Sequence, residues 1–432
     1  MGKTAFLFPG QGSQYTGMGK SLCEISSAAN AVFEEANDAL GFDIKKLCFE
    51  GSMEELTKTE NTQPAILTVS VAAYRVYTAE IGAPADFSAG HSLGEYSALC
   101  CSGALAFADA VRLVRQRGRF MQEAVAPGVG TMAAVSGVGR ARIEEVCAGI
   151  SRPEALVVVS NYNSPDQIVL SGHASAVAKA GETLAAQGAR VIPLKVSAPF
   201  HSPLMQPAAD RLKEALSELT FGGFSYPVLS NVTAQPYDGA QSVPGLLTEQ
   251  LVKPVRWIDS MAFLTGQGVD KAVEIGPKTV LKNLMPQNAP SVRTFSFENR
   301  EDLKTIKRAL AADTNSDVPY NGIDLLTRCI AAAVCTKNSN WDNAAYQRGV
   351  VEPYQRIYAM REALIKENRQ PAPDEMQEAI AWLQEIFKTK GVSSGEENER
   401  LQEIFESTNT ASLLASLVSA EPEERIPVLQ GR

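Results

Sequence analysis

Short apolar runs alternate with longer segments of helical periodicity from the start of the chain to about Ala124. The first run, at residues 5–8, predicts a strand, and the segment 81–89 is expected to end in another. Residues 95–99 begin a segment compatible with a helix. This alternation predicts an α/β layer built around a mainly parallel sheet.

The rhythm changes after this layer. The next pattern predicts a strand at 131–137, a helix at 140–149, strands at 155–161 and 167–171, a helix at 174–187 and a strand at 190–196. The order β-α-β-β-α-β is that of a ferredoxin-like unit. Strand patterns return at 226–231 and 271–276, so the larger layer is expected to resume after an inserted subdomain.

The last 120 residues follow a different, helical pattern. Residues 313–317 predict a linker. Beyond it, apolar residues recur at helical spacing at Met376, Ile380, Leu383 and Phe387. Helix-start signals precede this stripe at Pro371, Pro373 and Asp374, and a second stripe follows at Leu401, Ile404 and Phe405. The pattern predicts a helical extension, which packs on itself or on the first domain, or docks a partner protein.

Composition narrows the class of protein. The 432 residues are 45% hydrophobic and 21% charged, which supports at least two packed units, and the net charge of −9 argues against a nucleic-acid partner. No apolar run approaches the roughly 20 residues that span a bilayer, and no signal-peptide layout is present. Seven cysteines without C-x-x-C spacing favour free thiols, a cytoplasmic location and no metal site.

The pattern G-x-S-x-G occurs at residues 90–94, as Gly90-His91-Ser92-Leu93-Gly94. A predicted strand precedes it and a helix-compatible segment follows, which is the setting that exposes a nucleophilic serine. Glycines suit such a turn because the backbone approaches closely on both sides of the serine. Ser92 is therefore the candidate nucleophile, with an ordinary glycine turn as the alternative.

A serine hydroxyl is a poor nucleophile until a nearby base takes its proton, and the chain has three histidines. His91 adjoins Ser92, and neighbouring side chains on such a turn point in different directions. His173 follows the predicted strand 167–171 and is expected to be a surface loop residue. His201 lies between Pro199 and Pro203, which fix the backbone, so it is the candidate base. A buried or capping histidine is the alternative.

The loop after the first strand offers backbone N–H groups. Gly10 and Gly12 flank Gln11 and free its N–H to point at a ligand. Together with the N–H of Leu93, it would form an oxyanion hole for a tetrahedral intermediate. A nucleotide-binding loop is excluded, because Gly19-Lys20-Ser21 lacks the earlier glycine of a Walker A motif, where Gln14 stands.

Taken together, these motifs resemble the malonyl-CoA:acyl carrier protein transacylases of fatty acid and polyketide synthesis. Five motifs occur in the order of that family, namely residues 8–14, residues 90–95, an arginine-rich helix with Arg117, Phe200-His201-Ser202 and Glu274-Ile275-Gly276-Pro277. The resemblance covers about residues 1–300. It implies a malonyltransferase acting by a ping-pong reaction, in which a malonyl-serine passes its acyl group to the phosphopantetheine thiol of an acyl carrier protein.

The resemblance assigns roles to the candidate residues. It implies Ser92 as nucleophile, His201 as general base and later acid, and the N–H groups of Gln11 and Leu93 as the oxyanion hole. Family members often orient the histidine with a backbone carbonyl instead of a triad acid. Gln250 matches that position, so its side chain is not expected to matter.

Malonate carries a carboxylate, so a selective enzyme needs a fixed cation. The predicted helix at 110–121 holds four arginines, namely Arg112, Arg115, Arg117 and Arg119. Chemistry alone does not choose among them, and a solvated helix face is the alternative. The resemblance implies Arg117 as the malonate clamp, and Phe200 as a residue that favours malonyl over methylmalonyl. Malonyl-CoA and acyl carrier protein are the implied partners, with no cofactor.

The resemblance also implies the domain organisation. An acyltransferase domain is expected at 1–312, with an α/β-hydrolase-like large subdomain at about 1–125 and 198–312 and a ferredoxin-like subdomain inserted at about 126–197. Residues 313–432 form the helical extension, without an assigned role. The catalytic domain is expected to be monomeric. Three alternatives stay open: a serine hydrolase or thioesterase, a trans-acting acyltransferase dedicated to polyketide synthesis, and a non-catalytic scaffold.

Overall fold

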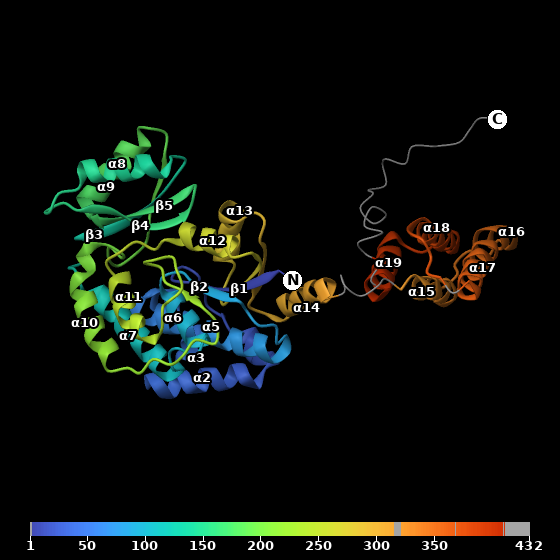
Figure 1. The fold of residues 1–432 in the computed structure, drawn as a ribbon, viewed down its shortest axis with the longest axis horizontal. Helices are drawn as coiled ribbons and strands as arrows, with labels where there is room; N and C mark the ends of the chain where they lie inside the picture. The colour runs from blue at the N-terminus through green and yellow to red at the C-terminus, as the bar shows by residue number, and fades with distance from the viewer. Residues whose placement is uncertain (1, 315–320, 368, 409, 411–432) are drawn as a thin grey trace. The chain divides into compact units, whose positions relative to one another are not determined.

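The computed structural model describes residues 2–314, 321–367, 369–408 and 410 (Figure 1). Contacts between residues divide the chain into an N-terminal unit, Met1–Lys307, and a C-terminal unit, Arg308–Arg432. Helix α14 (Arg300–Thr314) crosses this division. The helix therefore includes the first two residues of the predicted linker, and the rest of that linker lies outside the described residues.

Sheet A forms the centre of the N-terminal unit (Figure 1). Its five strands are β1 (Lys3–Phe8), β2 (Phe87–Gly90), β7 (Val228–Leu229), β8 (Val269–Ile275) and β9 (Arg293–Phe297). They pair in parallel in the order β7-β2-β1-β8-β9, which puts the first strand of the chain in the middle. Because both faces of this sheet are covered, Ala5, Leu7 and Phe8 are fully buried, and their run is continuously apolar.

Helices surround sheet A, and the longest of them, α5 (Thr59–Glu80), is buried over much of its length. Helices α5 and α7 pack closely because Gly118 of α7 lacks a side chain. A Cβ at this position would lie 2.6 Å from the carbonyl oxygen of Thr59 in α5. Besides α14 and the two helices of the inserted subdomain, the α-helices of this unit are α1 (Lys20–Ile25), α2 (Ser27–Leu40), α3 (Ile44–Glu50), α4 (Met53–Thr57), α5 (Thr59–Glu80), α6 (Leu93–Cys101), α7 (Phe107–Glu123), α10 (Gln206–Ser217), α11 (Val243–Gln250), α12 (Trp257–Gly266) and α13 (Val280–Asn288).

Sheet B and two helices form the inserted subdomain. Its elements are β3 (Gly130–Ser136), α8 (Arg140–Ile150), β4 (Val157–Ser164), β5 (Gln167–His173), α9 (Ala174–Ala185) and β6 (Arg190–Pro193). The strands pair antiparallel in the order β4-β5-β3-β6, and both helices contact the sheet. The predicted α/β fold with a ferredoxin-like insertion is thus confirmed.

Several strand boundaries in this subdomain differ from the prediction by one to three residues. Strand β4 begins at Val157 because Ala155 closes a turn by pairing with Arg152. Strand β6 ends at Pro193, three residues early. Leu194 and Val196 leave the sheet and line the cavity described below, so their apolar character reflects a pocket wall as well as a strand.

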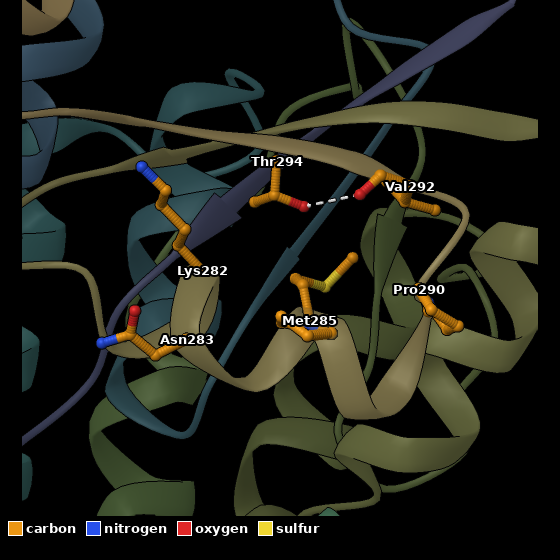
Figure 2. A pocket seen from close by; sticks show the side chains of 8 residues that line it. Lys282, Asn283, Met285, Pro290, Val292 and Thr294 are labelled. Carbon is orange, nitrogen blue, oxygen red and sulfur yellow. Dashed lines mark hydrogen bonds between the residues drawn. The ribbon is translucent and has the colours of Figure 1, made fainter. Parts of the chain in front are cut away.

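Between α13 and β9 lies a hollow of about 370 Å³ (Figure 2). Lys282 and Met285 reach it from the helix, and Val292 and Thr294 from the strand side, where the Thr294 hydroxyl donates to the Val292 carbonyl at 3.1 Å. None of the candidate site residues lines this hollow.

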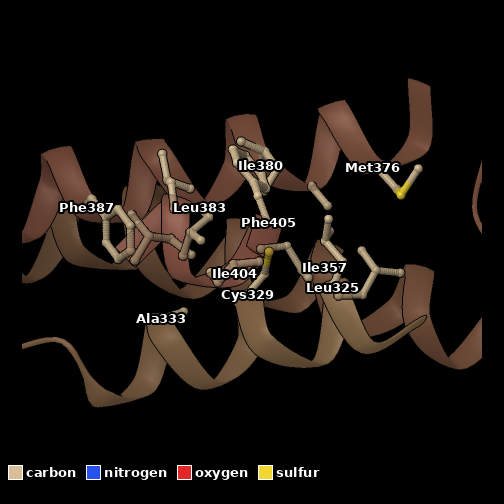
Figure 3. Packing of buried hydrophobic residues seen from close by; sticks show 14 of the residues in the cluster. Leu325, Cys329, Ala333, Ile357, Met376, Ile380, Leu383, Phe387, Ile404 and Phe405 are labelled. Atoms are coloured by element: carbon tan, nitrogen blue, oxygen red, sulfur yellow. The ribbon is translucent and has the colours of Figure 1, made fainter. Parts of the chain in front are cut away.

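The C-terminal unit is a bundle of helices. They are α15 (Gly322–Cys335), α16 (Asn343–Tyr346), α17 (Glu352–Lys366), α18 (Pro373–Lys390) and α19 (Ser394–Thr408), with a π-helical turn at Gln347–Val351. The predicted stripe of α18 is confirmed, since Met376, Ile380, Leu383 and Phe387 are fully buried (Figure 3). They share one core with Cys329 of α15 and with residues of α17 and α19, so the extension packs on itself.

The buried side chain of Lys390, from the last turn of α18, caps the C-terminal end of α15. The Lys390 ammonium group donates to the carbonyl oxygens of Ala333 and Thr336, at 2.6 and 2.9 Å. These carbonyls lie at the C-terminal end of α15, where no intrahelical donors remain and where a cation is favoured. Within the described ranges, no helix has both the length and the apolar character needed to cross a bilayer.

Candidate active site

Ser92 lies on a sharp turn between β2 and α6. Its backbone has φ 52° and ψ −104°, which is an unusual conformation for a residue with a side chain. A Cβ on Gly90 would lie 1.9 Å from the backbone of Gly94, and a Cβ on Gly94 would lie 2.0 Å from the carbonyl oxygen of Phe8. The glycines of the motif therefore permit close backbone contact, and the strained serine lies half-buried at the tip of the turn.

The structure brings His201 to Ser92. The His201 Nε2 atom lies 2.8 Å from the Ser92 Oγ, and Nδ1 lies 2.7 Å from the backbone carbonyl oxygen of Gln250. Because a carbonyl oxygen only accepts, Nδ1 carries the proton and Nε2 presents its lone pair to the serine. This is the tautomer that a general base needs.

Burial and a neighbouring charge keep His201 neutral. Desolvation by burial, followed by the positive charge of Arg117, lowers the pKa of its imidazole to about 3. The hydrogen bond to Gln250 opposes these two effects. The free imidazole is therefore the dominant form at neutral pH, ready to accept the serine proton.

Arg117 is 1% exposed, and its guanidinium lies beside Ser92. Its Nη2 lies 3.2 Å from the Ser92 Oγ and donates to the Gln250 Oε1 at 2.8 Å, while Nη1 donates to the Gln63 Oε1 at 2.8 Å. Its Nε has no hydrogen-bond partner, and the guanidinium lies 5.1 Å from the ring centre of Tyr96. A buried cation held by uncharged partners is a receptor for an anion.

The structure separates Arg117 from the other arginines of α7, which chemistry alone had left equivalent. Arg112 donates to the Ala39 carbonyl, Arg115 lies over the Phe42 ring, and Arg119 pairs with Glu60 at 3.9 Å. These three side chains serve the packing and the surface of the helix.

A buried polar network behind Ser92 was not found from the sequence. The Glu95 carboxylate accepts from the Tyr237 hydroxyl, from the Asn231 backbone N–H at 3.1 Å and from the Gln250 Nε2 at 2.7 Å. Burial raises the pKa of this carboxyl to about 7. The one signal for Glu95 in the sequence is that it is a charged residue in the first turn of an otherwise uncharged helix.

Two amide side chains complete this network. Asn231 accepts from the Ser92 N–H and donates to the Gly90 carbonyl, both at 2.7 Å, which ties the ends of the turn together. The Gln250 side chain bonds Arg117, Glu95 and the carbonyl oxygen of Ser92. The expectation that this side chain does not matter is therefore wrong, because its buried amide must be satisfied on all sides.

A cavity of about 170 Å³ opens over Ser92. Gln11, Leu93 and Phe200 all line it, together with residues of sheet B. Leu93 is the first residue of α6, so its N–H has no intrahelical acceptor. The loop of Gln11 lies against the turn, since a Cβ on Gly10 would be 2.3 Å from the carbonyl oxygen of His91.

The other two histidines have structural partners. The His91 Nε2 lies 2.8 Å from the Asn163 Oδ1, and its ring packs 5.5 Å from that of Trp257. His173 ends β5 half-buried, and its Nδ1 accepts from the Leu156 N–H at 2.9 Å. The prediction of a surface loop for His173 was wrong because the strand extends two residues further than its apolar run.

Comparison with known proteins places this site in a family. A family model described as acyl transferase domain matches residues 5–307. A malonyl CoA-acyl carrier protein transacylase of Bacillus subtilis is 40% identical over 397 residues, covering 92% of this chain and 99% of the relative. The protein of that name from Escherichia coli strain K12 is 46% identical over 285 residues, covering 66% of this chain and 92% of the relative.

Solved structures agree with these relatives. A malonyl-transacylase bound to a holo acyl-carrier protein of a type II polyketide synthase is 41% identical, with a TM-score of 0.69, and the match covers 70% of this chain and 98% of that one. The Bacillus subtilis match exceeds the 307 residues of the N-terminal unit by 90, so that relative also shares much of the C-terminal unit. This chain belongs to the acyl transferase family, and its N-terminal unit is the acyl transferase domain.

Proposed function

We propose that this chain transfers a malonyl group from malonyl-CoA to the phosphopantetheine thiol of an acyl carrier protein, through a malonyl-serine at Ser92. The names of its relatives support this reaction. The observation that carries it is the buried guanidinium of Arg117, which lies 3.2 Å from the Ser92 Oγ and has only uncharged direct partners.

In the first half-reaction, His201 Nε2 takes the proton of Ser92 as Oγ attacks the thioester carbonyl. The backbone N–H groups of Gln11 and Leu93 stabilise the oxyanion that forms. Collapse of the tetrahedral intermediate breaks the carbon–sulfur bond, and the protonated His201 returns its proton to the departing CoA thiolate. The product is the malonyl ester of Ser92, and no step calls on a cofactor.

Malonyl selectivity follows from the second carboxyl group of this acyl chain. A carboxylate beside Ser92 meets Arg117, whose Nε has no partner and whose Nη2 can exchange the Ser92 hydroxyl for a second carboxylate oxygen while it still donates to Gln250. Phe200, 6% exposed, closes the cavity beside His201 and limits the room for a branched acyl chain. A pocket of this kind discriminates one methyl group by roughly 1 to 3 kcal/mol.

In the second half-reaction, the carrier thiol attacks the malonyl-serine and His201 again acts as base. A hollow of about 600 Å³ adjoins the site and shares Gln11, His91 and Asn163 with it. This hollow supports entry of a long, narrow arm such as phosphopantetheine between the two sheets.

All residues proposed for the site come from the N-terminal unit, which supports a catalytically complete monomer. The seven free thiols support a cytoplasmic location.

Intact-mass spectrometry tests this function. Wild-type protein mixed with malonyl-CoA should gain one malonyl adduct, Ser92→Ala should gain none, and a holo carrier protein should discharge the adduct onto its own thiol. An adduct that decays to free malonate regardless of the carrier would instead indicate a hydrolase. Absence of any adduct would reject the proposed substrate or nucleophile.

A further inference from the structure

Glu95 is a buried carboxyl group that touches no reacting atom of the proposed mechanism. It lies three residues after Ser92 in the first turn of α6, with no exposed surface. Its Oε1 accepts from the Tyr237 hydroxyl, and its Oε2 accepts from the Asn231 N–H and the Gln250 Nε2. A buried carboxyl group in such a position orients each of its donors.

Its effect on Gln250 is to fix the direction of an amide. The Gln250 Nε2 faces three acceptors, namely Glu95 Oε2 at 2.7 Å, the Ser92 carbonyl oxygen at 2.9 Å and Asn231 Oδ1 at 3.3 Å. Its Oε1 then faces Arg117 Nη2 at 2.8 Å. A flipped amide would set its oxygen against a carboxylate and its NH₂ group against a guanidinium. Glu95, which supplies the shortest of the three contacts, therefore decides which end of Gln250 meets Arg117.

Gln250 in turn supports the guanidinium. Arg117 is held at Nη1 by Gln63 and at Nη2 by Gln250, which leaves Nε without a protein partner. Without an acceptor at Gln250, Nη2 would be buried with only the Ser92 hydroxyl as partner, and the guanidinium would rotate about its long side chain. The backbone carbonyl of Gln250, which orients His201, would stay in place.

We propose that Glu95 is a positioning residue that acts through the side-chain amide of Gln250 to hold Arg117 in the pose that receives an acyl carboxylate, and so sets the preference for malonyl over acetyl thioesters. This inference rests on the proposed function. It separates two tasks of Gln250: the main chain serves the base, and the side chain serves the cation.

The test compares kcat/KM for acylation by malonyl-CoA and by acetyl-CoA. Glu95→Leu keeps the volume but removes the acceptor, so the malonyl-to-acetyl ratio should fall about tenfold or more, as expected for loss of a hydrogen bond to a charged group. Glu95→Gln should keep a near wild-type ratio, because its carbonyl oxygen still accepts from Gln250 and its NH₂ group can donate to Tyr237. Tyr237→Phe is the matched control, since it removes one bond to Glu95 but leaves Gln250 held.

A second variant keeps the test decisive if Glu95→Leu does not fold. Gln250→Met removes the side-chain amide and preserves the backbone carbonyl, so it should lower the same ratio by a similar factor. An equal fall for both substrates, or an unchanged ratio in both variants, would overturn the inference alone. A wild-type protein without malonyl transfer would overturn the proposed function and this inference with it.

Discussion

Arg117 is a cation held out of water at the point where an acyl chain would end. Its direct protein partners are uncharged, and burial lowers the pKa of its guanidinium. A charge in this setting costs free energy until an anion reaches it, which is the condition for strong discrimination between a carboxylated and a plain acyl group. The free energy spent on burying the Arg117 charge therefore contributes to the proposed selectivity for malonyl over acetyl groups.

Arg117→Ala should lower malonyl transfer by at least about a hundredfold and leave acetyl transfer largely intact, because only malonate loses an ionic partner. Arg117→Lys should rescue little of the loss, since an ammonium group cannot reproduce the planar pair of donors. Steady-state kinetics with both CoA esters would measure this. An equal loss for both esters would contradict the role of a carboxylate receptor.

Acylation should stay level as the pH falls through 6.5, because the pKa of His201 is lowered to about 3 and the free base persists. The titration of Glu95 near pH 7 should not change the acylation rate, because a proton on its Oε1 leaves the Gln250 Nε2 bonded to its Oε2. The pH profile of kcat/KM with malonyl-CoA reports the free enzyme. A rate that halves near pH 6.5 would contradict the lowered pKa.

The same shift has a consequence for stability, with a definite sign. Between about pH 6.5 and 3, the unfolded chain binds a proton at His201 that the folded chain does not. This histidine therefore contributes most to stability above pH 6.5, and its contribution is lost as the pH falls toward 3. Unfolding by urea at a series of pH values would measure the slope.

Sequence motifs were sufficient for residues whose chemistry is local, such as Ser92 on its turn. They were insufficient for Glu95, Asn231 and the Gln250 side chain, because those roles depend on contacts between segments more than 130 positions apart. Three of the four arginines of α7 share the charge of Arg117 and differ from it only in what surrounds them. The role proposed for Arg117 therefore depends on which side chains pack around it.

At the scale of elements, the turn between β2 and α6 works because three backbone segments nearly touch. The absent side chains of Gly10, Gly90 and Gly94 make room for backbone atoms of neighbouring segments. Regular periodicity predicted the strands and helices on either side, including the whole inserted subdomain. Boundaries such as the end of β6 were beyond it, because an apolar residue suits both a strand and a cavity wall.

Gly94→Ala should destabilise the fold by about 1 to 3 kcal/mol or more, because its Cβ would lie 2.0 Å from the Phe8 carbonyl oxygen. Gly149→Ala is a matched control in α8, where nothing lies within 4 Å of the new Cβ. It should stabilise by about 0.5 to 1 kcal/mol. Chemical denaturation measures both, and similar midpoints for the two variants would contradict the close approach.

At the scale of the whole molecule, two units have separate cores. The bundle core draws only on the C-terminal unit, and the two cores around the sheets draw only on the N-terminal unit. The Escherichia coli relative matches over 92% of its own length, and that match covers only 66% of this chain. Sequence patterns located the helical extension, yet they carry no motif that assigns it a role.

A chain ending at Thr314 should keep malonyl transfer within about twofold of the full chain, because every residue proposed for the site belongs to the N-terminal unit. The measurement is transfer to holo carrier protein at equal enzyme concentration, with thermal unfolding as a check that α14 is retained intact. A loss of tenfold or more would show that the bundle takes part in transfer or in capture of the carrier.

The central place of β1 in sheet A bears on how the chain is made. Strand β1 is synthesised before its neighbours β2 and β8, which follow only at Phe87 and Val269. The nascent chain thus carries an apolar strand with two unpaired edges until β2 is made, and with one unpaired edge until β8 is made, which is a hazard for aggregation and an opportunity for chaperones. Ser92 likewise emerges long before His201 and Gln250, so translation yields the nucleophile early and its activation late.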